Sequence, residues 1–543
     1  MSDFSYVRTE MLPEQQPPLT EVGIVGWARA NLFNGVVNSV LTVLSVTFLA
    51  YVVWHLSLWA FRSSWTANSL SECREQIALA YGDGVHGACW AVIRDRFLQL
   101  MYGFYPREEY WRINLSFVLM LVALLPVLFM AVPRKLLWFS AIYPALAFWL
   151  LWGGSIWGPL LIVAGFFVAG FVGMYVTNIK GALFGIIVGV LVWLFWMIFV
   201  VSSVSGGITA SIAEGRYQSI LTESAAVLDD SNATEQALKD AKSDADSVNR
   251  VMALKESLPA AKARAAELRA ALPDTVASIY DTDDITSSLD ENDVELLREA
   301  ISAESDVVSA ESAIGQIDEN IGLFGLKPVE SAKFGGFAIS VIIGVAGIVG
   351  SLPIGIVLAL GRQSDLIIVK GICVGFIEFI RGVPLITLLF VASTLLNYFL
   401  PPGTTFDIIL RVVIMVTLFA SAYMAEVVRG GLAALPKGQY EAADSLGLDY
   451  WKAQRLIIMP QALKISIPGI VSSFIGLFKD TTLVSIIGIL DPLGLSNAIR
   501  ADAAWNGIYW ELFAFIALLF FVFCFSMSRY SMYLERKLNT GHR

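Results

Sequence analysis

The sequence has few of the residues from which metal centres and catalytic sites are built. It contains three histidines, His55, His86 and His542, which lie far apart, and four cysteines without the spacing of a zinc site. We therefore expect no metal site. The chain also lacks a Walker A pattern and any convincing pairing of a nucleophile with a base. We expect no enzyme activity and no cofactor bound by this chain.

Charged residues are scarce as well. They make up 15% of the 543 residues, whereas 56% are hydrophobic and 15 are tryptophan. Soluble domains average about 25% charged residues, so the composition predicts a polytopic membrane protein. The charge is uneven, because residues 206–333 hold 25 acidic and 11 basic side chains, a balance of −14, and the remainder has a balance of +4. The acidity therefore belongs to one segment.

Ten apolar runs approach the ~20 residues that a spanning helix needs. They cover residues 33–61, 112–132, 137–153, 156–177, 181–204, 335–360, 366–400, 407–427, 467–490 and 508–530. The run 366–400 is too long for one straight span, and Pro384 should kink or split it. The first residues are polar and carry no signal-peptide cleavage pattern. We expect an all-α fold divided into 1–32, 33–204, 205–334, 335–535 and 536–543.

Basic residues between the runs orient the chain, because cytoplasmic loops retain Lys and Arg. Arg134, Lys135, Lys180, Arg362, Arg429, Lys437, Arg536 and Lys537 all fall inside if both termini are cytoplasmic. The loops 62–110 and 491–507 and the acidic segment 206–333 are then external. An external loop of a bacterial inner-membrane protein lies in an oxidising compartment. We expect a disulfide between Cys73 and Cys89, with two unpaired thiols as the alternative.

The acidic segment carries two apolar stripes with alternating spacings of three and four residues. They comprise Leu254, Leu258, Ala261, Ala265, Leu268 and Leu272, and then Val307, Ala310, Ile314, Ile317 and Ile321. Such stripes suit two helices packed as an antiparallel hairpin. We expect Pro259 to break or begin a helix near Ser257, Pro273 to end the first helix, and the link 274–293 to turn the chain. The hairpin is either a docking arm for a partner or, as we favour, a tolerated insertion.

A polar segment, 438–460, lies between the runs 407–427 and 467–490. It contains Glu441, Ala442 and Ala443, then Gly447, and then Pro460. Its composition predicts two short helices joined at Gly447 on the membrane face. We expect Glu441 near a helix start, where its charge suits the dipole, and Pro460 at the end of the unit.

Two further places hold polar residues within apolar runs. Lys479, Asp480 and Thr481 lie in the run 467–490, and Arg381, Gly382 and Pro384 mark the break in 366–400. Charge inside a membrane is costly and usually is paired or faces a water-filled path, and broken helices can line a cavity. These six residues are candidates for a translocation path or gate. The alternative is that their charges lie near span ends and reach the interface.

These motifs resemble those of ABC importer permeases of the polar and general L-amino-acid transport family. The family's EAA loop is matched by Glu441, Ala442, Ala443, Gly447, Ile457 and Pro460, with Met459 where Leu is usual. Its flanking motifs are matched by Arg381, Gly382, Pro384 and Leu385, by Ala425, Glu426, Arg429, Gly430 and Gly431, and by Lys479, Asp480, Thr481, Thr482 and Leu483. The resemblance is dense over 335–535, whereas the segment 206–333 departs from the family pattern.

The resemblance implies a five-helix permease core in a bacterial inner membrane, with the EAA loop coupled to cytoplasmic ATP-binding subunits that use ATP. It also implies a second, similar permease subunit, a periplasmic amino-acid-binding protein, an L-amino-acid substrate and surrounding lipid, and no nucleic acid. One alternative is the same role for another polar metabolite. Another is a scaffold that binds a partner through the acidic hairpin. A secondary carrier would need inverted repeats, and none is visible between 33–204 and 335–530.

Overall fold

A computed structural model shows the all-α membrane fold that the sequence predicts. It describes residues 23–129, 131–230, 234–272, 291–321, 324–395 and 407–538. Within these ranges, nine helices are long and apolar enough to cross a membrane, or ten if one bent pair is counted as a single span. The chain is therefore a polytopic α-helical membrane protein, with about the number of spans expected.

The chain forms two compact units. The first combines Met1–Gly103 with Gly335–Arg543, and the second is Phe104–Phe334. Gly103, which has a φ of 66°, lies so close to Gly335 that a Cβ on Gly103 would come within 2.4 Å of the Gly335 Cα. The chain thus leaves the first unit and re-enters it at adjacent points. This division differs from the expected one, because the segment up to Gly103 is grouped with Gly335–Arg543.

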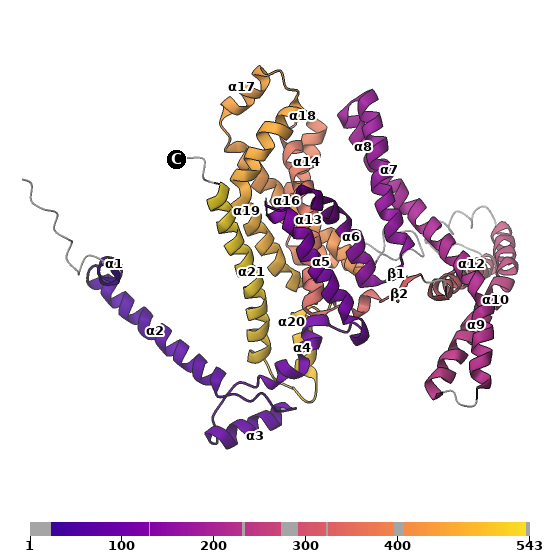
Figure 1. Ribbon diagram of the computed structural model, residues 1–543, viewed down its shortest axis with the longest axis horizontal. Helices are drawn as coiled ribbons and strands as arrows, with labels where there is room; N and C mark the ends of the chain where they lie inside the picture. The colour runs from indigo at the N-terminus through magenta and orange to yellow at the C-terminus, as the bar shows by residue number, and fades with distance from the viewer. Residues whose placement is uncertain are drawn as a thin grey trace, which may run out of the picture. The chain divides into compact units, whose positions relative to one another are not determined.

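The first unit is built from thirteen described helices (Figure 1). They are α1 (Gly23–Asn31), α2 (Val36–Phe61), α3 (Leu70–Tyr81), α4 (Ala91–Tyr102), α13 (Gly336–Arg362), α14 (Ile367–Gly382), α15 (Leu385–Phe390), α16 (Ile408–Ala433), α17 (Lys437–Ser445), α18 (Tyr450–Ala453), α19 (Met459–Asp480), α20 (Pro492–Ala501) and α21 (Trp510–Leu538). Three short pieces join them, the π-helices η5 (Val391–Leu395) and η7 (Gln454–Ile458) and the 3-10 helix η8 (Thr481–Ile487).

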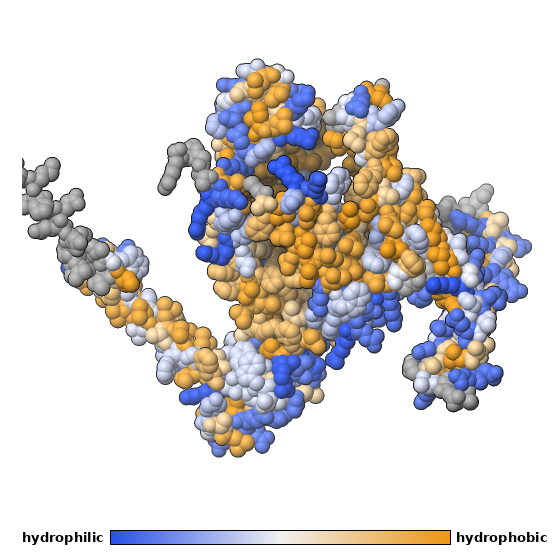
Figure 2. All heavy atoms as spheres, in the orientation of Figure 1, coloured by the Kyte–Doolittle hydropathy of each residue, from blue (hydrophilic) through white to orange (hydrophobic). Residues whose placement is uncertain are grey.

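The centre of this unit is the packing of α13 on α16, of α16 on α19, and of α19 on α21. Ile339, Ile343, Val412 and Val416 are fully or almost fully buried there. Figure 2 shows an apolar band along α21 between polar ends, which suits a helix that lies in hydrocarbon and ends in water.

The run 366–400 is split where the sequence predicts. Helices α14 and α15 meet at an angle of 102°. Val383 and Pro384 have extended backbones at the break, because proline cannot supply the N–H that would continue α14 and disfavours a helical residue before it.

The second unit holds the remaining elements. They are η1 (Arg107–Glu109), α5 (Tyr110–Leu128), η2 (Arg134–Leu136), α6 (Leu137–Trp152), β1 (Gly154–Ser155), α7 (Trp157–Lys180), α8 (Ala182–Phe195), the π-helix η3 (Trp196–Val201), α9 (Ser202–Asp229), α10 (Glu235–Ala270), α12 (Glu291–Ile321), β2 (Gly325–Leu326) and η4 (Ser331–Lys333). Strands β1 and β2 are antiparallel, with Gly154 opposite Leu326.

The last span of this unit continues beyond the membrane. Residues Phe184–Asp229 form one 46-residue helical run, which at 1.5 Å per residue is about 69 Å long, roughly twice the hydrocarbon thickness. Its end, α9, packs against both α10 and α12. The acidic segment is thus a three-helix bundle that extends a span, rather than only the two-helix hairpin that the stripes predict.

The predicted antiparallel pairing of the two stripes is present. Lys262 lies 2.6 Å from Glu311 and Arg269 lies 3.4 Å from Glu304, so α10 and α12 run in opposite directions. The expected break at Pro259 is wrong, because α10 passes through this residue without interruption. Packing of α10 on two neighbours offsets the lost backbone hydrogen bond. Pro273 and most of the link 274–293 lie outside the described residues.

Candidate functional site

The segment 437–460, here called the elbow, is two short helices joined at a glycine. Gly447 has a φ of +66°, a left-handed conformation that favours glycine. Its N–H donates to the Asp444 carbonyl over 2.9 Å, which closes the turn after α17. The Asp449 carboxylate accepts from the Lys452 N–H over 2.9 Å and so caps α18. This bond holds the pKa of Asp449 below its usual value.

Two expectations about the elbow are corrected. Helix α17 begins at Lys437, so Glu441 is its fifth residue. The helix dipole favours a negative charge in the first turn, and Glu441 lies beyond that turn. Pro460 lies in the first turn of α19 within a 38-residue helical run, Tyr450–Ile487, and ends nothing. The π-helix η7, Gln454–Ile458, ends just before this proline, so its missing N–H falls where the hydrogen-bond pattern of the run changes from π to α.

The elbow presents apolar side chains as well as the predicted polar ones. Ala443 is buried, whereas Glu441 and Ala442 are exposed. Leu446 is 71% exposed and Leu456 is 64% exposed, and Tyr450 and Trp451 are also exposed. Motif spacing and charge, the signals in the sequence of this segment, do not indicate these four residues. Exposed apolar side chains on a polar segment can mark a surface that another chain covers.

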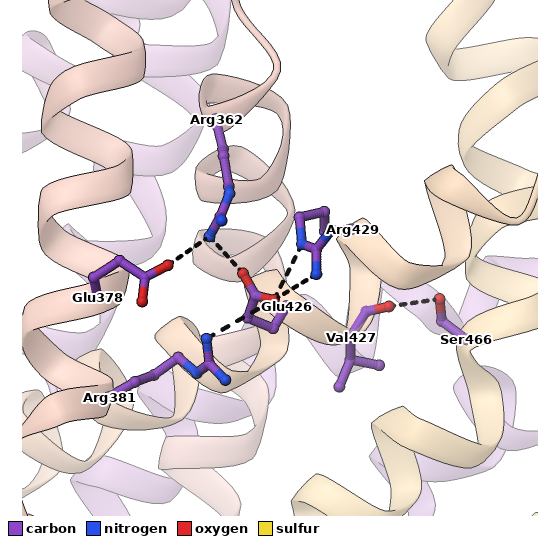
Figure 3. A network of polar contacts seen from close by, with 7 residues as sticks. All are labelled: Arg362, Glu378, Arg381, Glu426, Val427, Arg429 and Ser466. Carbon is purple, nitrogen blue, oxygen red and sulfur yellow. Dashed lines mark hydrogen bonds and ion pairs between the residues drawn. The ribbon is translucent and has the colours of Figure 1, made fainter.

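Glu426, on α16, is the centre of a polar network that joins three helices (Figure 3). Arg362 of α13 lies 2.6 Å from Glu426 and 3.1 Å from Glu378 of α14. Arg429 lies 2.9 Å and Arg381 lies 3.8 Å from the other Glu426 oxygen. Only 17% of the Glu426 side chain is exposed. We call these five residues the Glu426 cluster.

Close to this cluster, α13, α16 and α19 line a half-open cavity of about 250 Å³. Its lining residues are Ser351, Phe419, Ala420, Tyr423, Met424, Ser473, Phe474, Gly476, Leu477 and Asp480. The Asp480 carboxylate supplies an anion to the wall. The guanidinium of Arg381 stands 5.7 Å from the centre of the Tyr423 ring, a cation–π distance. One wall residue thus contacts a cation of the Glu426 cluster.

The other predicted path residues lie elsewhere. Lys479 is exposed and Thr481 is buried, and neither lines the cavity. The Thr481 hydroxyl donates to the Phe478 carbonyl over 2.8 Å, a bond within its own chain segment. Gly382 and Pro384 lie at the bend between α14 and α15. The structure therefore places Asp480 at the cavity wall and Arg381 beside it, and leaves the remaining four apart from it.

Cys73 and Cys89 form a disulfide bond with a Cα–Cα distance of 6.0 Å. Both cysteines are buried, in a hydrophobic cluster that also contains Leu495, Ile499 and Trp505 from the far end of the chain. We call residues 62–103 the stapled segment. The predicted disulfide is therefore present, whereas nothing in the sequence indicates what the two cysteines pack against.

The chain is similar to known membrane components of transport systems. The family model for the binding-protein-dependent transport system inner membrane component matches residues 351–540. The chain is 47% identical, over the full length of both chains, to the glutamate/glutamine/aspartate/asparagine transport system permease protein BztC of Rhodobacter capsulatus. It is 32% identical to the inner membrane amino-acid ABC transporter permease protein YhdY of Escherichia coli, covering 95% of this chain and 93% of that one.

A crystal structure of an amino acid ABC transporter is also similar. It is 30% identical, covers 37% of this chain and 92% of that chain, and has a TM-score of 0.34.

Proposed function

Since the chain belongs to the family of binding-protein-dependent transport system inner membrane components, we propose that it is the permease subunit of an ATP-driven importer for L-amino acids. The relative that is 47% identical over the whole chain carries glutamate, glutamine, aspartate and asparagine in its name. We propose the same acidic and amide amino acids as substrates here. The chain itself is a multi-pass protein of the inner membrane.

The observation that carries this proposal is the elbow. Gly447 sets the angle between two short helices, and Leu446, Tyr450, Trp451 and Leu456 leave an apolar surface uncovered. A cytoplasmic ATP-binding subunit would cover this surface and move it as it binds and hydrolyses ATP. Because α18, η7 and α19 form one continuous helical run, Tyr450–Ile487, a push on this part of the elbow would be transmitted along α19 to the cavity wall.

The proposed orientation follows from the elbow. If the elbow meets the ATP-binding subunit, both termini are cytoplasmic, and the stapled segment and the acidic bundle are external. A periplasmic binding protein would deliver the amino acid to the external side. A second, similar permease subunit would complete the path. This chain would bind no cofactor, and ATP would be used by its partners.

The cavity suits the groups that all L-amino acids share. The Asp480 carboxylate would bind the α-ammonium group, and the Arg381 guanidinium beside Tyr423 would bind the α-carboxylate. Two small residues at the wall, Ser351 and Ser473, would leave room for the substrate side chain, and their hydroxyls can form hydrogen bonds with its amide or carboxylate. Asp480 and Arg381 thus form the proposed translocation site.

The experiment is a comparison of two exposed leucines in the assembled complex. Leu446→Asp places a charge on the apolar surface of the elbow, and Leu79→Asp does the same on α3, where Leu79 is 82% exposed. We expect Leu446→Asp to release the ATP-binding subunits on co-purification and to abolish ATP-driven uptake of labelled glutamate in proteoliposomes. Leu79→Asp should retain the ATP-binding subunits. Equal retention by both variants would contradict the coupling role of the elbow.

Substrate choice needs its own measurement. Competition of unlabelled glutamine, aspartate and asparagine against glutamate uptake tests the proposed group, with arginine and leucine as controls. Uptake of a different polar metabolite with no response to amino acids would favour that alternative. Absence of any ATP-driven uptake by the complete complex would favour the scaffold.

A further inference from the structure

The stapled segment is held against the loop that follows the cavity helix by a chain of polar contacts. The Trp505 indole Nε1 donates to Asp95 Oδ2 over 2.9 Å. The same Asp95 oxygen lies 3.0 Å from Arg96 Nε, and Arg96 Nη2 lies 3.0 Å from Asp502 Oδ2. Asp95 and Arg96 therefore bind two residues that are about 400 positions away in the sequence.

Backbone contacts reinforce this attachment. The Leu70 N–H donates to the Ala504 carbonyl over 2.8 Å, and the Cys89 N–H donates to Glu511 Oε1 over 2.8 Å. Helix α4, which carries Asp95 and Arg96, contacts α13, α20 and α21. The two segments share one buried hydrophobic cluster, in which Trp505 has no exposed surface. Such a large, fully buried side chain with a satisfied N–H fixes the position of its loop.

The attached loop, residues 488–509, here called the capped loop, is directly connected to the cavity. Helix α19 ends at Asp480, η8 follows as Thr481–Ile487, and α20 begins at Pro492. Asp491 caps α20 through Gly494 N over 2.8 Å, so the turn between η8 and α20 is fixed. With little slack between Asp480 and the capped loop, a shift of the loop would move the end of α19 that carries the cavity carboxylate.

We propose that Asp95 and Arg96 are positioning residues for transport: they hold the capped loop, and through it the Asp480 end of α19, in the arrangement that the transport cycle uses. The disulfide keeps α3 and the start of α4 together, so that α4 presents both residues to the loop. This role rests on the proposed importer function, because its main readout is uptake.

A purely structural role would make a different prediction. If the contacts only stabilised the fold, each loss of a contact would lower the unfolding temperature and the amount of complex, and activity per folded complex would stay the same. If they position the loop, uptake per folded complex falls and returns when an ion pair is rebuilt with opposite polarity. Charge reversal of Arg96 and Asp502 separates the two.

The experiment uses the complete complex in proteoliposomes, with Arg96→Asp, Asp502→Arg and the double variant that restores opposite charges. We expect each single variant to reduce ATP-driven glutamate uptake at least fivefold per folded complex, with basal ATPase activity and binding of the ATP-binding subunits unchanged. The double variant should regain at least half of the uptake. Arg74→Asp, which changes an exposed arginine of the same segment, serves as the charge control.

A second variant protects the test against misfolding. Trp505→Phe keeps most of the buried ring and removes only the N–H that Asp95 accepts, so it should fold and show an intermediate loss of uptake. Normal uptake in both single charge variants would overturn the proposal, and so would a loss that the double variant does not recover. Absence of uptake by the wild-type complex would instead count against the importer function itself.

Discussion

Helix α19 has two very different ends. At its start lies the elbow, where Leu446 and Leu456 are exposed and Gly447 has open space around it. At its other end lies the capped loop, covered by the stapled segment, a disulfide and a shared hydrophobic cluster. We call the elbow the open end of α19, because its apolar side chains are exposed, and the capped loop the closed end, because it is buried under the stapled segment.

The difference indicates how a permease subunit divides its stability. If the elbow binds a partner as proposed, its apolar surface has to stay uncovered, because burying that surface within the chain would remove the binding energy. An end that has to keep one geometry is fixed by covalent and hydrophobic contacts of its own. The closed end should therefore depend on its own side chains for stability, whereas the open end should depend on a partner.

Loss of the Cys73–Cys89 disulfide should have the largest effect on stability. Replacing both Cys73 and Cys89 by serine opens a loop whose ends are 16 residues apart, and we expect it to lower the free energy of unfolding of the closed end by about 3 kcal/mol. The measurement is thermal unfolding followed by tryptophan fluorescence, since Trp90 and Trp505 lie in this region. Cys524→Ser, at a free cysteine, is the control. Equal unfolding temperatures would mean that packing alone closes this end.

The second largest effect should come from the Glu426 cluster. Glu426→Gln removes the one carboxylate that contacts Arg362, Arg381 and Arg429, and leaves three guanidinium groups close together. Loss of a buried pair costs about 3–5 kcal/mol, and we expect about 2 kcal/mol here because the arginines are partly exposed.

Glu378→Gln is the matched control for this prediction. Glu378 is 56% exposed, and within the described residues its ion pair is with Arg362. Its loss should change the unfolding temperature little. If both substitutions lowered the unfolding temperature equally, the stability of the cluster would not be centred on Glu426.

Much of this arrangement follows from local sequence. Long apolar runs predict the spans, Pro384 predicts the bend between α14 and α15, and Gly447 predicts the joint of the elbow, because each depends on neighbouring residues alone. The expectations for Pro259 and Pro460 failed for a related reason. A proline ends a helix only where its N–H would have been needed and packing does not hold the helix, and neither condition can be judged from residue type.

The rest depends on contacts between distant residues. Nothing near Arg96 in the sequence indicates Asp502, and the resemblance to a family motif did not show that Glu426 binds arginines from two other helices. The continuation of Phe184–Asp229 beyond its span was also missed, because hydropathy falls after residue 204 while the helix persists through its packing on α10 and α12.

The cavity is lined by the part of α19 that lies between the elbow and the capped loop, and Asp480 is its carboxylate. A substitution of Asp480 tests whether this cavity is the transport site. Asp480→Asn keeps the shape of the wall and removes the charge that would bind an α-ammonium group. A lost charge-assisted hydrogen bond of about 1.5 kcal/mol predicts a roughly tenfold higher substrate concentration for half-maximal uptake. Lys479→Gln, beside it but not at the wall, should leave uptake unchanged. If the lysine variant had the larger effect, the path would run elsewhere.

The smallest effect should be found at Asp491, within the closed end. Burial raises the pKa of this carboxyl to about 6, from an ordinary value of 3.8. The folded protein therefore holds the proton more tightly than the unfolded chain. Its contribution to stability is complete below pH 3.8 and is lost as the pH rises through about 6.

Asp491→Asn removes this dependence while keeping a residue that can cap α20. The full pKa shift, which already contains the hydrogen bond from the Gly494 N–H, corresponds to about 3 kcal/mol as an upper bound. Relaxation and water at the site reduce such a cost, so we expect the variant to be about 1 kcal/mol more stable than the wild type above pH 6, with no advantage below pH 4. Thermal unfolding between pH 4 and pH 8 measures this difference. If the unfolding temperatures of the two proteins changed with pH in the same way, Asp491 would keep its charge throughout this range. Water would then reach the carboxyl group despite its burial.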